Sequence, residues 1–294
     1  MVNKKSSDRQ HHQQGHHGQG GEFPDLRIVA QDDLLLHEEE DLDRVARLID
    51  RLSADGVLKN PPIVASLAGS QRYMLLDGAN RVSALRNLEV PHLLVQVEHY
   101  EEPGLVISHW NHVVRDIEAK TIVEKANSIP GVTVKEGEPG DRGDESSPDY
   151  LCTISLSESK ALHLRGKLEL SERVGHLREL TKIYYHGPGR MDRVNHIDFP
   201  SVRQHYPHFG ALVLFPNFSK EDVRRVAEAG ERLPSGVTRI LVPRRVLGFN
   251  LQLALLKSHL PLQEKRHWLQ EAINEKVSER KVRYYQEPTF VFDD

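Results

Sequence analysis

The stretch HEEEDLDRVARLIDRLSADGVLKNPPIV (residues 37–64), followed eight residues later by YMLLDGANRVSALRNLEVPHLLVQV (residues 73–97), decides the fold. Its first part has apolar residues at helical spacing and ends at Asp55-Gly56, a typical left-handed stop. Apolar runs rich in β-branched residues then predict strands at 62–67, 72–76 and 92–98, with a short helix carried by Val82, Leu85 and Leu88. Helices and strands therefore alternate in this part of the chain.

Outside this stretch the pattern stays mixed. We expect strands at 26–30, 131–134, 150–156 and 211–215, helical stretches at about 107–128 and near 268–277, and a helix capped by Ser219. Residues 177–185 fit either a helix or a strand. Residues 135–149 (KEGEPGDRGDESSPD) contain no apolar residue and predict a flexible loop. The predicted fold class is therefore α+β.

Composition excludes several classes of protein. The 294 residues carry 39 basic and 43 acidic side chains, a net charge of −4, which lacks the positive field typical of nucleic-acid binders. The single cysteine, Cys152, allows no internal disulfide, no four-cysteine zinc site and no redox pair. No apolar run is long enough for a membrane span and no secretory signal is visible, so we expect a soluble, cytoplasmic protein.

The N-terminal segment differs from the rest of the chain. Residues 3–22 contain no aliphatic, aromatic or sulfur-containing side chain, so they cannot bury enough surface to offset their ordering entropy. We expect a disordered tail over residues 1–22, whose histidine pairs bind transition metals only adventitiously.

One turn has the features of an anion site. Asp77-Gly78-Ala79-Asn80-Arg81 lies between an apolar strand and a helix, where glycine lets the backbone approach a ligand and helix N–H groups suit an anion. Arg81 adds a cation with bidentate geometry. An ordinary capped turn with an arginine salt bridge shows the same pattern. The acid run Glu38–Asp41 is similarly explained by the dipole of the helix that follows.

Together with FSKEDVRRVAEAGERLPSGVTRILVPRRVLGFN (residues 218–250), these segments resemble the ParB/sulfiredoxin fold and, within it, the free L-serine kinases. The resemblance implies a ParB/sulfiredoxin-like nucleotide-binding domain at 23–130 and a second, mixed α/β domain at 131–294 that closes over the cleft. It also implies phosphoryl transfer from ADP or ATP, with Mg²⁺, to the hydroxyl of free L-serine, which gives O-phospho-L-serine.

The resemblance also implies roles for individual residues. Glu38 matches the catalytic base, and Asp77 matches a second catalytic residue that also binds Mg²⁺. The remaining matches are the phosphate-binding Gly78, Ala79, Asn80 and Arg81, and the serine-binding His37, Trp110, Thr238 and Arg239. The family's DGHHR and TRH steps have histidines where this chain has Ala79, Asn80 and Ile240.

A second reading of the fold is a ParB-like, nucleotide-responsive DNA-binding regulator. The net charge and the lack of a helix-turn-helix pattern count against it, although Lys265, Arg266 and His267 could form a basic patch. Sulfiredoxin activity is excluded because its cysteine would fall at Ala79, and Cys152 fits a core position. We therefore expect serine and a nucleotide as partners, without nucleic acid or membrane, and the sequence leaves the oligomeric state open.

Overall fold

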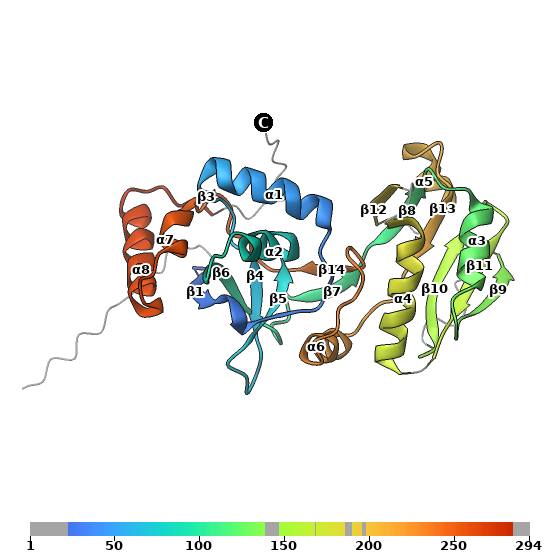
Figure 1. Ribbon diagram of the computed structural model, residues 1–294, viewed down its shortest axis with the longest axis horizontal. Helices are drawn as coiled ribbons and strands as arrows, with labels where there is room; N and C mark the ends of the chain where they lie inside the picture. Colours follow the sequence, from blue (N-terminus) through green and yellow to red (C-terminus); the bar gives the residue numbers. More distant parts are fainter. Residues whose placement is uncertain (1–22, 139–146, 168, 186–189, 196–197, 285–294) are drawn as a thin grey trace, which may run out of the picture. The chain divides into compact units, whose positions relative to one another are not determined.

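The computed structural model describes residues 23–138, 147–167, 169–185, 190–195 and 198–284 (Figure 1). Contacts group Pro24–Leu269 into one compact unit and assign residues 1–23 and 270–294 to another. The predicted disordered tail at residues 1–22 lies outside the described residues. The mixed α and β architecture that we predicted is confirmed.

The first sheet has five strands in the order β1-β6-β4-β5-β2. Their bounds are β1 Asp25–Ala30, β2 Leu34–Leu36, β4 Ile63–Ser66, β5 Tyr73–Asp77 and β6 His92–His99. Strands β2 and β5 run parallel, with Leu36 opposite Leu75. Because parallel strands end at the same edge of a sheet, the residues after Leu36 and those after Leu75 meet there.

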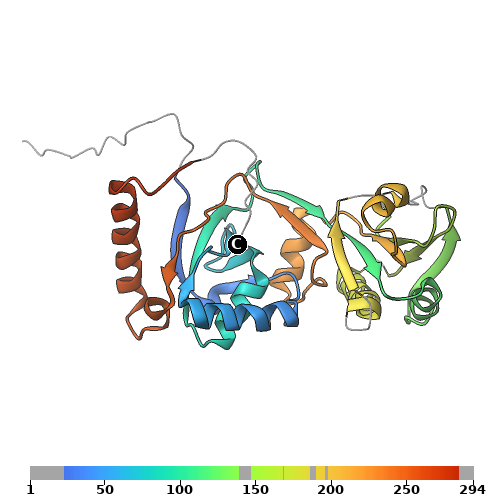
Figure 2. The ribbon, with the colours of Figure 1, turned by 90° about the horizontal axis from the view of Figure 1, so that it is seen from above.

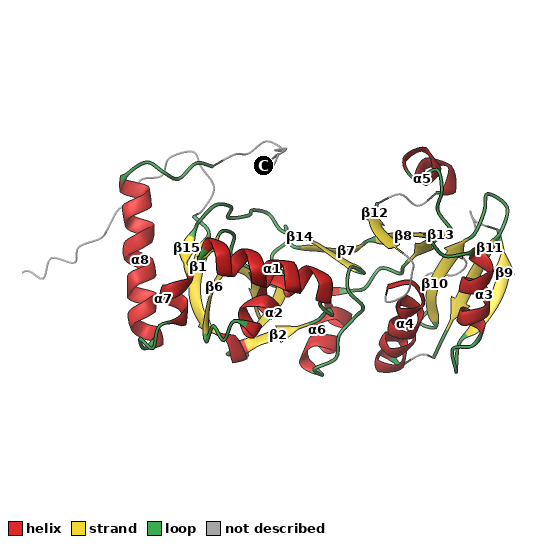
Figure 3. Cartoon of the chain, turned by 45° about the horizontal axis from the view of Figure 1, so that its top comes forward, coloured by secondary structure: helices red, strands yellow, loops and turns green. Residues whose placement is uncertain are grey.

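Two helices pack on each other beside this sheet (Figures 1 and 3): α1 (Leu42–Asp55) and α2 (Ala79–Asn87). Helix α1 is capped at its start by Asp41, whose side chain accepts a hydrogen bond from Arg44 N at 3.0 Å, and at its end by Gly56, which has a φ of +62°. Helix α2 follows directly after β5 and is capped by Gly78. Both helices therefore begin at the edge where β2 and β5 end.

The second sheet has six antiparallel strands in the order β12-β8-β13-β10-β11-β9, with α3 and α4 in contact with each other (Figure 2). The strands are β8 Asn111–Arg115, β9 Thr133–Gly137, β10 Tyr150–Ser155, β11 Ala161–Arg165, β12 Arg190–Val194 and β13 Ala211–Leu214. The helices are α3 Ala119–Asn127, α4 Leu170–Tyr185 and α5 Phe199–His205. Strand β10 is buried along its whole length and includes Cys152, as expected of a core position.

The predicted helical stretch at 107–128 is wrong over its first half. Residues Val106–His109 form β7, Asn111–Arg115 form β8, and the helix starts only at Ala119. Asp116 has a φ of +61°, which ends the strand before the helix begins. The loop predicted at 135–149 also starts later, because β9 continues to Gly137, and residues 139–146 lie outside the described part.

The chain then returns to the first sheet. After α6 (Lys220–Glu228), Leu233 pairs with Glu38, and β14 (Thr238–Leu241) pairs with β7, so that Thr238 lies opposite His109. Short strands β3 (Val57–Leu58) and β15 (Leu251–Gln252) also pair, followed by α7 (Leu253–Lys257) and α8 (Leu262–Ser278). The predicted domain division at residue 130 stays a prediction.

Candidate functional site

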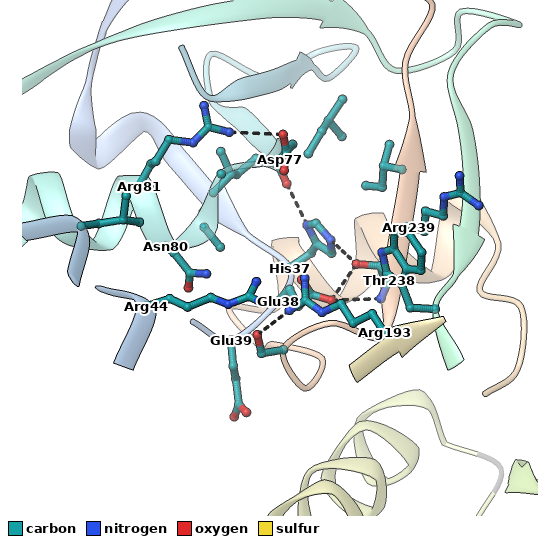
Figure 4. Close-up of a pocket in the computed structure, with 18 of the residues that line it drawn as sticks. His37, Glu38, Glu39, Arg44, Asp77, Asn80, Arg81, Arg193, Thr238 and Arg239 are labelled. Carbon is teal, nitrogen blue, oxygen red and sulfur yellow. Dashed lines mark hydrogen bonds and ion pairs between the residues drawn. The ribbon is translucent and has the colours of Figure 1, made fainter. Parts of the chain in front are cut away.

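A cavity of about 810 Å³ opens where these segments meet (Figure 4). Its walls come from the residues after β2, the start of α1, the turn between β5 and α2, the loop between β7 and β8, and strands β12 and β14. A volume of this size suits a small-molecule ligand. All ten site residues that we predicted line it: His37, Glu38, Asp77, Gly78, Ala79, Asn80, Arg81, Trp110, Thr238 and Arg239.

Glu38 is held by one of its two carboxylate oxygens. Its Oε1 accepts hydrogen bonds from Val237 N at 3.0 Å, Thr238 N at 2.9 Å and Thr238 Oγ1 at 2.9 Å. The hydrogen bonds from Leu233 N to His37 O and from Glu39 N to Leu233 O, both 2.8 Å, fix the backbone on either side. Within the described residues, Oε2 has no partner. The arrangement orients the carboxylate and leaves one oxygen available to a ligand in the cavity.

His37 connects three strands behind Glu38 (Figure 4). Its ring is 4% exposed, with Nδ1 2.7 Å from Leu75 O and Nε2 3.0 Å from Thr238 Oγ1. The carbonyl can only accept, so Nδ1 carries the hydrogen. Burial lowers the pKa of His37, against smaller opposing effects of the Glu38 charge and the Leu75 carbonyl. The ring is therefore neutral near pH 7, and its Nε2 is an acceptor.

Asp77 is paired with two arginines at the end of β5. Its Oδ2 accepts from Arg81 Nη2 at 3.2 Å and from Arg245 Nη1 at 2.6 Å. Burial alone would raise the pKa of Asp77, but Arg81 and Arg245 outweigh it and lower the pKa. Arg81 also donates through Nη1 to the carbonyls of Asn60 and Pro61, at 2.8 and 3.1 Å. Much of the Arg81 guanidinium is thus engaged with protein, and Arg245 is a further cation that the sequence did not single out.

The rest of the turn joins the two helices. Asn80 Oδ1 accepts a hydrogen bond from Asp41 N at 2.8 Å, which ties the start of α2 to the start of α1. Ala79 is the first residue of α2 and can offer only its backbone N–H, as expected. Because first-turn N–H groups have no partner within a helix, this end of α2 suits an anion.

A second group lies on the β14 side of the cavity. The Arg239 guanidinium stacks 4.7 Å from the centre of the Trp110 ring and donates to Asn195 Oδ1 at 2.9 Å. Trp110 lies between two strands rather than on the helix that we expected. Arg193, which the sequence analysis missed, reaches this side from β12. Its Nη2 is 3.3 Å from Ser235 Oγ, and its buried Nε has no partner among the residues that the structure describes.

Three more arginines line the cavity from α1. Arg44, Arg47 and Arg51 are spaced by three and four residues, which places them on one face of the helix. Within the described residues, Arg47 and Arg51 have no hydrogen-bond or ion-pair partner. In all, seven arginines and three carboxylates line the cavity, a formal charge of +4 with His37 neutral. The sequence analysis did not single out the three α1 arginines, although their helical spacing could have indicated that they share one face.

The cavity suits a metal ion only in combination with a ligand. The described residues include no group of three or more histidine, cysteine or acidic side chains that could hold a metal. Mg²⁺ commonly takes one or two carboxylates, with water and substrate phosphates completing its shell. Asp77 fits that role for an ion that arrives with a nucleotide. No described helix is long and apolar enough to cross a membrane.

Comparisons with known proteins agree on one activity. No protein-family model matches the chain. The chain is 25% identical over 257 residues to the ATP-dependent L-serine kinase SbnI of Staphylococcus aureus, covering 83% of this chain and 89% of that protein. It is 23% identical over 170 residues to an ATP-dependent L-serine kinase of Staphylothermus marinus, covering 54% and 66%. A solved free serine kinase in complex with AMP has a TM-score of 0.67 at 17% identity, covering 79% of this chain and 93% of that one.

Proposed function

We propose that this protein transfers a phosphoryl group from ADP or ATP to the hydroxyl of free L-serine and so produces O-phospho-L-serine. The observation that carries the proposal is Glu38, a fixed carboxylate with one open oxygen in a cavity of formal charge +4. The similarity over 83% of the chain to an L-serine kinase supports the same reaction.

Glu38 acts as the general base. A serine hydroxyl does not ionise near neutral pH, so a carboxylate must accept its proton as the oxygen attacks phosphorus. Oε1 is occupied by three donors, so Oε2 is the atom that takes the proton. The three donors also prevent the carboxylate from rotating away from the attacking hydroxyl. This orientation lowers the barrier because the reacting groups are already positioned.

The nucleotide phosphates bind at the cationic side of the cavity. The N–H groups at the start of α2, with Gly78 and Ala79, cradle one phosphate, and Asn80 and Arg81 hold the turn in place. Asp77 would hold Mg²⁺, which would supply positive charge against the phosphoryl oxygens. Arg245 and the α1 arginines offset the remaining negative charge.

Free serine lies on the β14 side. Arg239, stacked on Trp110, is placed to bind the α-carboxylate, and Thr238 and His37 border the position of the side-chain hydroxyl. We also propose that residues 131–294 complete the cleft as a second domain and that the protein is cytoplasmic. We expect no nucleic-acid partner. The DNA-binding regulator that shares this fold has no support among the comparisons, whose named activity is serine phosphorylation.

The proposal is tested by incubating the protein with serine, Mg²⁺ and either ADP or ATP, followed by mass spectrometry for O-phosphoserine. Glu38→Gln should lower kcat by about 10²- to 10⁴-fold, the usual contribution of a general base, while nucleotide affinity changes little. Glu40→Gln is the matched control, because Glu40 belongs to the same acid run, pairs with Arg232 at 2.7 Å and does not line the cavity. Absence of product with both nucleotides, when calorimetry shows that they bind, would refute the proposal.

A further inference from the structure

We propose that His37 sets the proton affinity of Glu38 by competing with it for the hydroxyl hydrogen of Thr238. His37 is then a positioning residue that acts on the base through Thr238. The inference rests on the proposed function, in which Glu38 accepts the proton of serine.

The evidence is that the single hydroxyl hydrogen of Thr238 faces two acceptor atoms. Thr238 Oγ1 lies 2.9 Å from Glu38 Oε1 and 3.0 Å from His37 Nε2, and both are acceptors. His37 cannot supply the missing hydrogen from Nε2, because its Nδ1–H is committed to Leu75 O and burial lowers the pKa of the ring. The Thr238 hydroxyl has one hydrogen and can satisfy only one of the two acceptors at a time.

The protonation state of Glu38 decides which acceptor receives it. While Glu38 is ionised, its charge makes Oε1 the stronger acceptor, and His37 Nε2 is left without a hydrogen bond. Once Oε2 has taken the serine proton, the carboxyl group is neutral, and the hydroxyl hydrogen can turn to His37 Nε2. The Val237 and Thr238 backbone N–H groups still hold Oε1 in this second state.

This exchange strengthens the base. When Glu38 is protonated, it loses the hydrogen bond from the Thr238 hydroxyl, but the same hydroxyl then donates to His37. The new hydrogen bond stabilises the protonated state of Glu38 and so raises its affinity for the proton. The other charged groups that line the same cavity, Glu39, Asp77 and the seven arginines, act on Glu38 in both states and are not part of the exchange. Without the imidazole acceptor, Glu38 would keep the Thr238 hydrogen and bind the serine proton more weakly.

Two substitutions of His37 separate this role from a structural one. His37→Asn can keep the hydrogen bond to Leu75 O but cannot reach Thr238, whereas His37→Gln can reach Thr238 but loses Leu75. In His37→Asn the pH at which kcat is half-maximal on the acid side should fall by about one unit, the size expected of one hydrogen bond between neutral groups, with about a tenfold loss of maximal kcat. In His37→Gln that pH should stay near the wild-type value.

Thr238→Val gives a shift of the opposite sign. It removes the hydroxyl donor from ionised Glu38 and keeps both backbone donors, so the acid-side midpoint should rise. Thr238→Ser should restore the wild-type profile. Thr181→Val is a control in α4, where the lost hydroxyl is buried to a similar degree and donates only to Arg178 O. Shifts of the same sign in His37→Asn and Thr238→Val, or none in either, would overturn the proposal.

A second measurement does not need activity. Nitrogen NMR of the full-length protein labelled in histidine, with His37→Asn to assign the signal, should show Nδ1 protonated and Nε2 unprotonated. Glu38→Gln mimics the neutral carboxyl and should move the Nε2 signal toward its hydrogen-bonded value. A protonated Nε2 in the neutral ring, or no response to Glu38→Gln, refutes the shared hydrogen. Failure to form O-phosphoserine would instead refute the proposed function.

Discussion

Replacing Gly78 with alanine tests whether the turn between β5 and α2 forms the phosphate site. Gly78 has a φ of +102°, and an added Cβ would lie 3.0 Å from Arg81 Nη2 and 3.2 Å from its Cζ and Nε. A left-handed backbone costs an L-residue ~1–2 kcal/mol. Displacing the anchored Arg81 guanidinium weakens its hydrogen bonds to Asn60, Pro61 and Asp77 and adds ~1 kcal/mol. We therefore expect Gly78→Ala to lower the free energy of unfolding by ~2–3 kcal/mol.

Gly56→Ala is the matched control. Gly56 also has a positive φ, +62°, but nothing lies within 4 Å of the position of its Cβ, and it does not line the cavity. It should cost only ~1 kcal/mol and leave nucleotide binding unchanged. Gly78→Ala should weaken ADP binding about tenfold, or ~1.4 kcal/mol, in titration calorimetry, with stability read from urea unfolding. Equal destabilisation by both variants, or unchanged ADP affinity in Gly78→Ala, would refute the reasoning.

Three further predictions concern the cations, the core and the serine side. Arg47→Gln and Arg51→Gln should each weaken nucleotide binding by ~0.3–1 kcal/mol and reduce its salt dependence in calorimetry, since both side chains are solvated and line the cavity. Burial lowers the pKa of His112 from 6.5 to about 3, so the unfolded state takes up a proton first as the pH falls. The free energy of unfolding should then fall below pH 6.5 by up to ~1.4 kcal/mol per pH unit for this group. In His112→Gln, the free energy of unfolding measured with urea should depend less steeply on pH. Trp110→Ala, which removes the ring beneath Arg239, should raise the KM for serine about three- to tenfold and affect kcat less, as steady-state kinetics would show.

The sequence correctly predicted those helices, strands and turns whose structure depends only on residues close together in the chain. Helix α1 and its stop at Gly56, strand β5 and the glycine turn after it, and the helix cap at Ser219 each depend on neighbouring residues and were all found. The stretch from 107 to 128 failed because its apolar spacing fits a helix, whereas its strands are stabilised by partners far away in the chain. Strand β7 pairs with β14, about 130 residues later, and that pairing overrides local preference.

The same distinction applies to the site. Glu38 and the Asp77 turn were predicted to share a site because of the resemblance, and the parallel pairing of β2 with β5 explains why they line one cavity. Arg193 and Arg245 come from segments with no local motif, and no periodicity in the sequence connects them to the cavity. The donors that orient Glu38 are about 200 residues away from it, so only the folded chain could reveal them.

The DGHHR motif of the free L-serine kinases has two histidines that this chain lacks, yet seven arginines supply this cavity with positive charge. A histidine is charged only below its pKa, near 6.5 when unperturbed, whereas an arginine is charged at every physiological pH. In this chain, Ala79 and Asn80 occupy the positions of the two histidines. Asn80 accepts a hydrogen bond from Asp41 N, which connects the start of α2 to the start of α1. The arginines on α1 line the same cavity as the turn from Asp77 to Arg81. Positive charge beside this turn therefore comes from arginines of the neighbouring helix rather than from histidines of the turn itself.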